Sequence, residues 1–197
     1  ERRALAQAMV EDVLAVLAEH PLISNVTLLS DDPSANMLAV KYGIAHRLES
    51  SLDCVGLNPI IERCCELLSA QSAEPIVVLH GDLPTLTAGD ISAVVEALHS
   101  EKALIVGCDR HNIGTNLLAF EPTRRPEFSF GADSCARHCA WAAKLGVPVK
   151  VLQRSGIALD IDEPQDLGLL IQELQTRGPS ACAQLLSDTE LGKRIVG

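Results

Sequence analysis

The fold of this chain is decided by residues 75–84, PIVVLHGDLP. The aliphatic run predicts a strand over 75–80, and because both of its faces are apolar we expect it in the middle of a sheet. Gly81 allows the backbone to approach a ligand closely, and Asp82 projects from the strand end. A carboxylate there is well placed to bind Mg2+. A turn or helix-capping aspartate is the plainer interpretation, and the motif alone does not separate the two.

Strands and helices alternate on both sides of this segment. The apolar pattern predicts further strands over 25–30, 44–48, 103–106, 115–120, 147–152 and 158–161. It predicts helices over 2–19, 33–42, 58–70, 87–99, 134–145 and 164–176, and a helical tail. Asn58 fits the N-cap of the third helix and Pro59 its first turn. The alternation predicts one domain over 1–197, a Rossmann-like three-layer α/β/α fold with a mainly parallel sheet.

Composition excludes several classes of function. Sixteen basic against 26 acidic residues give a net charge of −10, and no basic run is present, so nucleic-acid binding is not expected. No apolar run approaches the ~18 residues of a membrane span. Seven cysteines, an odd number with two adjacent, argue against a disulfide framework and favour a reducing cytoplasm. Cys135, His138 and Cys139 lack a second cluster that would complete a zinc site.

A second acidic motif lies at residues 159–164, LDIDEP. In an extended segment Asp160 and Asp162 lie on the same side. Ligands of such sheets bind at the carboxyl ends of strands, so these two acids and Asp82 are candidates for one divalent-cation site. The alternative is a solvated acidic turn in which Asp162 caps the next helix.

Two polar segments follow predicted strands or precede a predicted helix. In residues 109–116, DRHNIGTN, Arg110 is suited to a phosphate or to an ion pair with a carboxylate, and Thr115 and Asn116 to a ligand's polar atoms. The plainer interpretation is a loop that satisfies its own backbone. Residues 130–134, FGADS, precede a helix whose free amides suit an anion, although Ser134 could be an N-cap alone.

Gly56-Leu57-Asn58 also lies at a predicted helix start and is by itself only a cap. Taken in order with Gly-Asp-Leu-Pro, Asp-Arg…Gly-Thr-Asn, Phe-Gly…Ser…His and Leu-Asp-Ile-Asp-x-Pro-x-Asp-Leu, however, it resembles the 2-phospho-L-lactate guanylyltransferase family. That family includes phosphoenolpyruvate and 3-phospho-D-glycerate guanylyltransferases of coenzyme F-420 biosynthesis. It is a branch of the MobA-like nucleotidyltransferases, and the resemblance extends from the first helix to about Leu170.

The resemblance implies a fold of the nucleotide-diphospho-sugar transferase type and transfer of GMP from GTP to a small phosphorylated acid, with pyrophosphate released. It implies Mg2+ as cofactor and assigns residues to three groups. The metal-binding acids would be Asp82, Asp160 and Asp162. The acceptor pocket would contain Thr115, Gly131 and Ser134, with Asn116 and Arg110 beside it, and Gly56 and Asn58 would lie near the nucleotide.

The chain departs from the family pattern in three places. Asn112 replaces a glycine, and Ala132-Asp133 replaces Pro-Gly. The chain opens with Glu1-Arg2-Arg3 and enters a helix at once, whereas the family places a strand and a basic, nucleotide-gripping loop before that helix. We therefore expect this strand and loop to be missing here.

Other functions remain open from the sequence. Another MobA-like nucleotidyltransferase would act on molybdopterin or a sugar phosphate. A glycosyltransferase would use the Asp-x-Asp pair with a sugar nucleotide, and a non-catalytic subunit would bind GTP without turnover. The expected partners are GTP and a phosphorylated acid, with no nucleic acid and no membrane. The first and last helices offer faces through which a homodimer could form.

Overall fold

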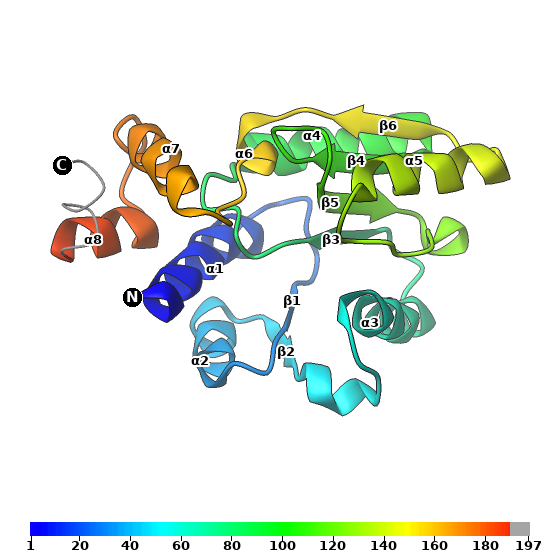
Figure 1. Ribbon diagram of the computed structural model, residues 1–197. Helices are drawn as coiled ribbons and strands as arrows, with labels where there is room; N and C mark the ends of the chain where they lie inside the picture. Colours follow the sequence, from blue (N-terminus) through cyan, green and yellow to red (C-terminus); the bar gives the residue numbers. More distant parts are fainter. Residues whose placement is uncertain (190–197) are drawn as a thin grey trace.

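The computed structural model describes residues 1–189, arranged around two β-sheets (Figure 1). In the smaller sheet, β1 (Thr27–Leu29) pairs in parallel with β2 (Ala45–Arg47). The larger sheet has the order β3 (Ile76–Leu79), β5 (Thr115–Phe120), β4 (Leu104–Cys108), β6 (Val149–Leu152). In it, β4 and β6 are parallel, and β5 runs antiparallel to both β3 and β4. The strands of this sheet other than β5 therefore run in one direction.

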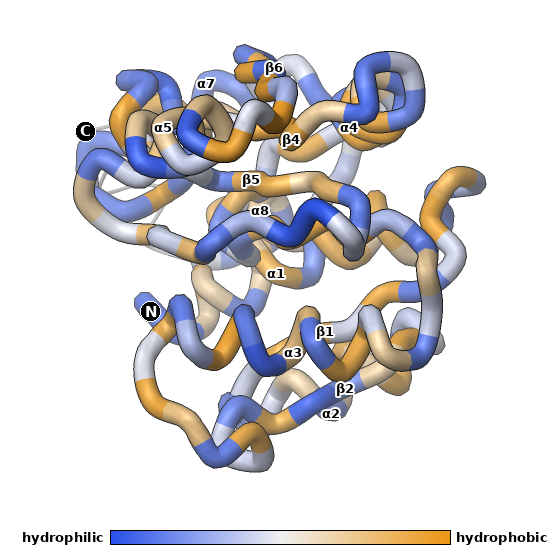
Figure 2. Tube along the Cα trace, turned by 90° about the vertical axis from the view of Figure 1, so that its right-hand side faces the viewer, coloured by the Kyte–Doolittle hydropathy of each residue, from blue (hydrophilic) through white to orange (hydrophobic). Residues whose placement is uncertain are grey.

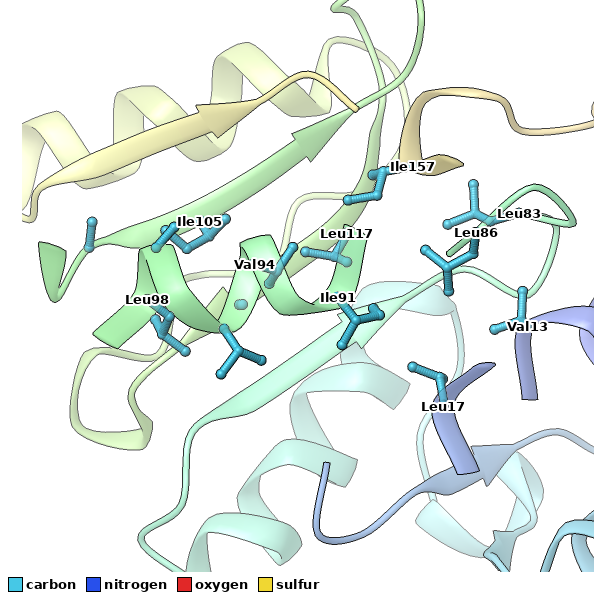
Figure 3. Packing of buried hydrophobic residues seen from close by; sticks show 14 residues of the cluster. Val13, Leu17, Leu83, Leu86, Ile91, Val94, Leu98, Ile105, Leu117 and Ile157 are labelled. Carbon is cyan, nitrogen blue, oxygen red and sulfur yellow. The ribbon is translucent and has the colours of Figure 1, made fainter. Parts of the chain in front are cut away.

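Helices cover both faces of the larger sheet, which confirms the three layers. Side chains alternate along each strand, so Ile105 and Leu117 pack beneath α4 (Ala88–Glu101), as Figure 3 shows. Val106 and Leu118 point to the opposite face, under α3 (Leu57–Gln71) and α5 (Ser134–Leu145). The tube in Figure 2 is largely orange along β4 and β5, where the strands are buried on both faces.

The two ends of the described chain pack against each other beside the sheet. Helix α1 (Arg2–Ala18) contacts α7 (Pro164–Leu174) and α8 (Ala181–Asp188) in a third apolar cluster (Figure 1). The Asp12 carboxylate accepts hydrogen bonds from the N–H groups of Ala181, at 2.6 Å, and Cys182, at 3.0 Å, and so caps α8. None of the helices in the described part of the chain is long and apolar enough to cross a membrane.

The remaining elements are α2 (Pro33–Tyr42), the short α6 (Ser155–Ala158), and two 3-10 turns, η1 (Glu49–Leu52) and η2 (Pro122–Arg124). The helices predicted within residues 1–189 are all present, and the part of the predicted helical tail from 190 to 197 lies outside the described residues. The strand predicted over 158–161 is wrong: Ala158 is the last residue of α6, where its N–H donates to the Arg154 carbonyl, and residues 159–161 pair with no strand that the structure describes. Asn58 is not the N-cap of α3 as predicted; Gly56 is, and the Asn58 side chain is engaged elsewhere.

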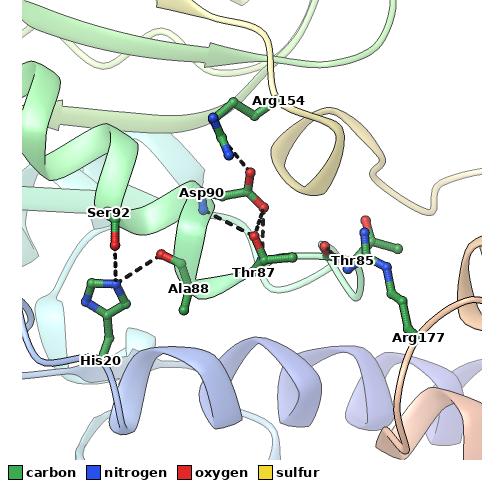
Figure 4. Close-up of polar contacts among 8 residues, drawn as sticks. All are labelled: His20, Thr85, Thr87, Ala88, Asp90, Ser92, Arg154 and Arg177. Carbon is green, nitrogen blue, oxygen red and sulfur yellow. Dashed lines mark hydrogen bonds and ion pairs between the residues drawn. The ribbon is translucent and has the colours of Figure 1, made fainter.

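The loop after β3, which carries Asp82, is held by a polar network at the start of α4 (Figure 4). Thr87 and Asp90 form a reciprocal capping box, with N···O distances of 3.0 and 3.2 Å. Asp90 is buried and also accepts from Arg154 Nε at 2.6 Å. Arg177 donates to the Thr85 carbonyl from the far side. This network ties the loop to α6 and to the chain that follows α7.

A groove of about 1050 Å³ separates the two sheets. It lies between the strands β1 and β3, whose facing edges have no strand partner among the described residues. Among these residues β3 is thus an edge strand and not the central strand that its apolar sequence predicted. Its walls are α1, through side chains such as Val10 and Leu14, and α3, through side chains such as Ile61 and Leu68. Two unpaired strand edges therefore face each other across an apolar space.

Candidate active site

The two acidic motifs meet at the end of β3. The Ile161 N–H donates to the carbonyl of Asp82 at 3.3 Å, which brings the 160–162 segment alongside. Burial raises the pKa of Asp82; His80 opposes this effect, and the nearby Asp162 and Asp160 add to it. Asp82 Oδ1 is buried and has no hydrogen-bond partner among the described residues. A buried, unpaired carboxylate oxygen facing two more acids is costly for folding alone, and a cation would relieve that cost.

Asp160 shares this electrostatic environment. Burial is the main cause that raises its pKa, hydrogen bonds from its own backbone and from Asn116 oppose it, and Asp162 and Asp109 raise it further. The Asn116 amide donates to the Ile157 carbonyl at 2.9 Å. Asn116 therefore holds the segment that carries Asp160. The sequence had suggested only a ligand contact for this side chain.

The acids fit Mg2+ only together with a substrate. Among residues 1–189, no group of three or more His, Cys, Asp or Glu side chains is placed to hold a metal ion by itself. Magnesium is commonly bound through one or two carboxylates, waters and substrate phosphates, and does not need a closed protein cage. The unpartnered Oδ1 of Asp82 and the raised pKa values of Asp82 and Asp160 match such an open site.

Arg110 forms an ion pair with a carboxylate, one of its two predicted roles. Its guanidinium lies 2.6 Å from Asp166 Oδ1, and Asp166 is buried. Asp166 Oδ2 accepts from the N–H groups of Asp162, at 3.0 Å, and Glu163, at 2.8 Å. Burial raises the pKa of Asp166, but the hydrogen bonds from Glu163, Arg110 and Asp162 outweigh it and lower the pKa.

Asp166 was not among the predicted site residues, although its carboxylate positions the backbone of Asp162. The sequence feature that could have identified it is the capping box Glu163-x-x-Asp166, with Pro164 in the first turn of the helix. Asp162 itself does not cap α7; Glu163 does. Arg110 thus contacts the carboxylate that holds the backbone of Asp162 and Glu163.

The Asp109 loop satisfies its own backbone, as the plainer interpretation predicted. The Asp109 carboxylate accepts from the N–H groups of His111, at 3.0 Å, Ile113, at 2.9 Å, and Gly114, at 2.9 Å. Asn112 has a φ of 58°, in the left-handed region that asparagine tolerates better than most residues. The replacement of a glycine at this position therefore preserves the loop.

The replacement of Pro-Gly by Ala132-Asp133, the second departure from the family pattern, also places a residue other than glycine in the left-handed region. Asp133, where the family pattern has glycine, has a φ of 55° and is the N-cap of α5, without a side-chain capping bond. Ser134 is therefore the first residue of the helix and not its cap. Gly131 has a φ of 112°, which a side chain would strain, and its carbonyl accepts from the Ser134 N–H at 3.1 Å. Asp133 therefore takes the left-handed conformation that glycine adopts readily.

Asn58 joins the start of α3 to this loop. Its Oδ1 accepts from the Phe130 N–H at 2.7 Å, and its Nδ2 donates to the Phe130 carbonyl at 3.2 Å. The Phe130 ring meets His80, beside Asp82, edge to face at 5.1 Å between ring centroids. Gly56, Asn58, the 130–134 loop and the end of β3 therefore belong to one region of the molecule.

One pair of cysteines is bonded, although the cysteine count argued against a disulfide framework. Cys108, at the end of β4, is bonded to Cys135 in the first turn of α5, with 6.1 Å between their Cα atoms. The packing of α5 on β4 brings them within bridging range. Because Cys135 is held in this disulfide, it is not available to bind a metal ion together with His138 and Cys139.

Comparison with known proteins identifies relatives over most of the chain. The protein family described as "Guanylyl transferase CofC like" matches residues 1–179. A phosphoenolpyruvate guanylyltransferase of Sphaerobacter thermophilus is 36% identical over 167 residues, 85% of this chain and 79% of that protein. A 3-phospho-D-glycerate guanylyltransferase of Phenylobacterium zucineum is 33% identical over 195 residues, 95% of this chain and 85% of that protein.

Solved structures share the fold at low sequence identity. A protein of Desulfovibrio desulfuricans G20, described as a nucleotide-diphospho-sugar transferase, has a TM-score of 0.78 at 16% identity, covering 97% of this chain and 84% of that one. A cytidylyltransferase of Leptospira borgpetersenii has a TM-score of 0.61 at 15% identity, covering 95% and 85%. These similarities establish the nucleotide-diphospho-sugar transferase fold.

Proposed function

The chain belongs to the CofC-like guanylyl transferase family, and from this membership we propose that it transfers GMP from GTP to a small phosphorylated carboxylic acid. The observation that carries the proposal is the meeting of Asp82 with the Asp160–Asp162 segment at the end of β3. The acceptor is 2-phospho-L-lactate, phosphoenolpyruvate or 3-phospho-D-glycerate. The product would enter coenzyme F-420 biosynthesis.

The transfer needs little acid-base chemistry. An acceptor phosphate oxygen, already anionic at neutral pH, forms a bond to the α-phosphorus of GTP, and the bond from that phosphorus to the pyrophosphate oxygen breaks. Catalysis then consists of alignment and charge neutralisation. Asp82, Asp160 and Asp162 would hold Mg2+, which supplies the positive charge that offsets the phosphates.

The other side chains align the two substrates. Thr115, Gly131 and Ser134 would bind the acceptor, with amides at the start of α5 oriented toward its anionic group. Gly56 and Asn58 would lie near the nucleotide. Arg110 and Asn116 would act through the segments that they hold, residues 162–166 and 157–160. A homodimer and a cytoplasmic location remain predictions.

The product distinguishes this reaction from its rivals. We expect phosphorus-31 NMR of full-length protein with Mg2+, GTP and one acid to show two coupled diphosphate signals that link guanosine to the acid. Signals of GMP or GDP alone would contradict transfer to an acid. A coupled product formed only with molybdopterin or a sugar phosphate would indicate another nucleotidyltransferase of the same fold.

We also propose that the groove between β1 and β3 receives one more strand, from the segment that the family places before its first helix. Two unpaired strand edges and two apolar helix walls suit an extended apolar segment. A chain with a net charge of −10 needs local positive charge to bind a triphosphate, and the loop after such a strand would supply part of it.

Hydrogen exchange tests this strand. We expect amides of β1 and β3 to exchange more slowly in protein that carries the preceding segment than in residues 1–197 alone. The outer edge of β6, on the far side of the larger sheet, serves as internal control and should not change. Equal exchange of β1 and β3 in the two proteins would show that the segment does not enter the groove.

A further inference from the structure

His138 connects the two sides of the proposed acceptor pocket. It lies on α5, its side chain is fully buried, and both of its ring nitrogens have partners. Nε2 accepts from the Ser129 backbone N–H at 3.1 Å. Nδ1 lies 3.1 Å from Thr115 Oγ1. The Phe130 ring packs edge to face on the imidazole at 5.2 Å between centroids and closes that side.

These contacts determine where the imidazole proton lies. A backbone N–H can only donate, so Nε2 must carry a lone pair. Burial, with a contribution from Arg137, lowers the pKa of His138 to about 4, so the ring is neutral at physiological pH. A neutral imidazole has one N–H, which is therefore on Nδ1. Nδ1 donates to Thr115 Oγ1, and the hydroxyl proton of Thr115 must point away from His138.

We propose that His138 is a positioning residue that turns the Thr115 hydroxyl into a hydrogen-bond donor for an anionic oxygen of the acceptor. The Asp109 carboxylate accepts three backbone N–H groups in the loop that precedes Thr115, so that loop fixes the position of the threonine while His138 fixes its proton. By accepting the Ser129 N–H, His138 also holds the chain that leads to Gly131. The inference rests on the proposed function, because it takes Thr115 to be in the acceptor pocket.

Two substitutions of His138 distinguish the hydrogen bond made by Nδ1 from the one made by Nε2. In His138→Asn the amide nitrogen replaces Nδ1 and keeps a donor for Thr115, but the acceptor for Ser129 is lost. In His138→Gln the longer side chain keeps an acceptor near Nε2 and loses the donor. We expect His138→Gln to raise the KM for the acceptor about tenfold, the effect of losing one oriented hydrogen bond to a charged group. His138→Asn should raise the acceptor KM less than His138→Gln does, because it keeps the donor for Thr115, and the KM for GTP should not change in either variant.

Thr115→Val supplies the cross-check. It should raise the acceptor KM about tenfold by itself, and His138→Gln should then add nothing, because the hydroxyl on which it acts is gone. If Thr115→Val leaves the acceptor KM unchanged, the pocket assignment in the proposed function is wrong. If Thr115→Val raises KM but His138→Gln raises it by the same factor in both backgrounds, the pocket stands and the positioning role is overturned.

Nitrogen-15 NMR of the wild-type protein tests the proton position without any substitution. We expect the His138 ring signals to be those of a neutral imidazole protonated at Nδ1. Protonation at Nε2, or at both nitrogens near neutral pH, would overturn the inference even if the variants failed to fold.

Discussion

Asp82→Asn is expected to lower the turnover number by about 10²- to 10³-fold, the usual loss when one group that stabilises transition-state charge is removed. Asn keeps the shape of Asp82 and removes the charge that would hold Mg2+ against the phosphates. Because the defect lies in charge neutralisation and not in the acceptor pocket, the KM for the acceptor should change little.

The same substitution should stabilise the protein in the absence of Mg2+ at neutral pH. The pKa of Asp82 is raised in the folded state, so its ionised form opposes folding above that pKa, and the opposition disappears as the pH falls through it. Asn removes the opposition at every pH. The gain in the free energy of unfolding should therefore be present at pH 7 and shrink in acid.

Urea denaturation and steady-state kinetics measure both effects. Asp188→Asn, an exposed residue at the end of α8, is the matched control and should leave activity and stability unchanged. Full activity of Asp82→Asn with Mg2+ would contradict the metal assignment. A less stable variant would instead show that Asp82 is a structural residue of the turn.

Gly156→Ala is expected to lower the free energy of unfolding by about 3 kcal/mol, at the upper end for overpacking a core position. A Cβ at Gly156 would lie 2.1 Å from Asp90 Oδ2 and 2.6 Å from the Thr85 carbonyl oxygen. The carboxylate is fixed by the capping box and Arg154, and the carbonyl is backbone, so neither has room to retreat. Either shift would disturb the loop that carries Asp82.

Gly168→Ala is the matched control for this substitution. Gly168 lies inside α7 and a Cβ there meets nothing within 4 Å. Alanine should raise the free energy of unfolding by up to about 1 kcal/mol through helix propensity. Equal effects of the two substitutions in chemical denaturation would contradict the packing described at α6.

Local patterns predicted the elements well where the signal lay within a few residues. The start of α4 at Thr87 and the end of α2 at Gly43 follow from capping chemistry that neighbouring residues carry. The strand predicted at 158–161 failed because its apolar alternation is local, whereas the close packing of Gly156 on Asp90 that accompanies α6 involves residues 66 positions apart.

Strand direction could have been inferred more fully. β4 and β5 are joined by the short Asp109 loop, and a parallel pair needs a crossover of about a dozen residues or more. The contacts around the proposed acceptor pocket have no comparable pattern in the local sequence. Asn58 meets Phe130 across 72 positions, and Thr115 meets His138 across 23. The resemblance to a family grouped these residues, and the structure adds the contacts of Arg110 with Asp166, of Asn58 with Phe130 and of Asn116 with Ile157.

The most direct test of guanylyl transfer is pyrophosphate release by full-length protein with Mg2+ and GTP, with 2-phospho-L-lactate, phosphoenolpyruvate and 3-phospho-D-glycerate added in turn and ATP and CTP as nucleotide controls. We expect release that requires GTP together with one of the acids, and that acid is then the acceptor. No release with any pair, from protein shown to be folded, would contradict guanylyl transfer and favour a sugar-nucleotide or non-catalytic role.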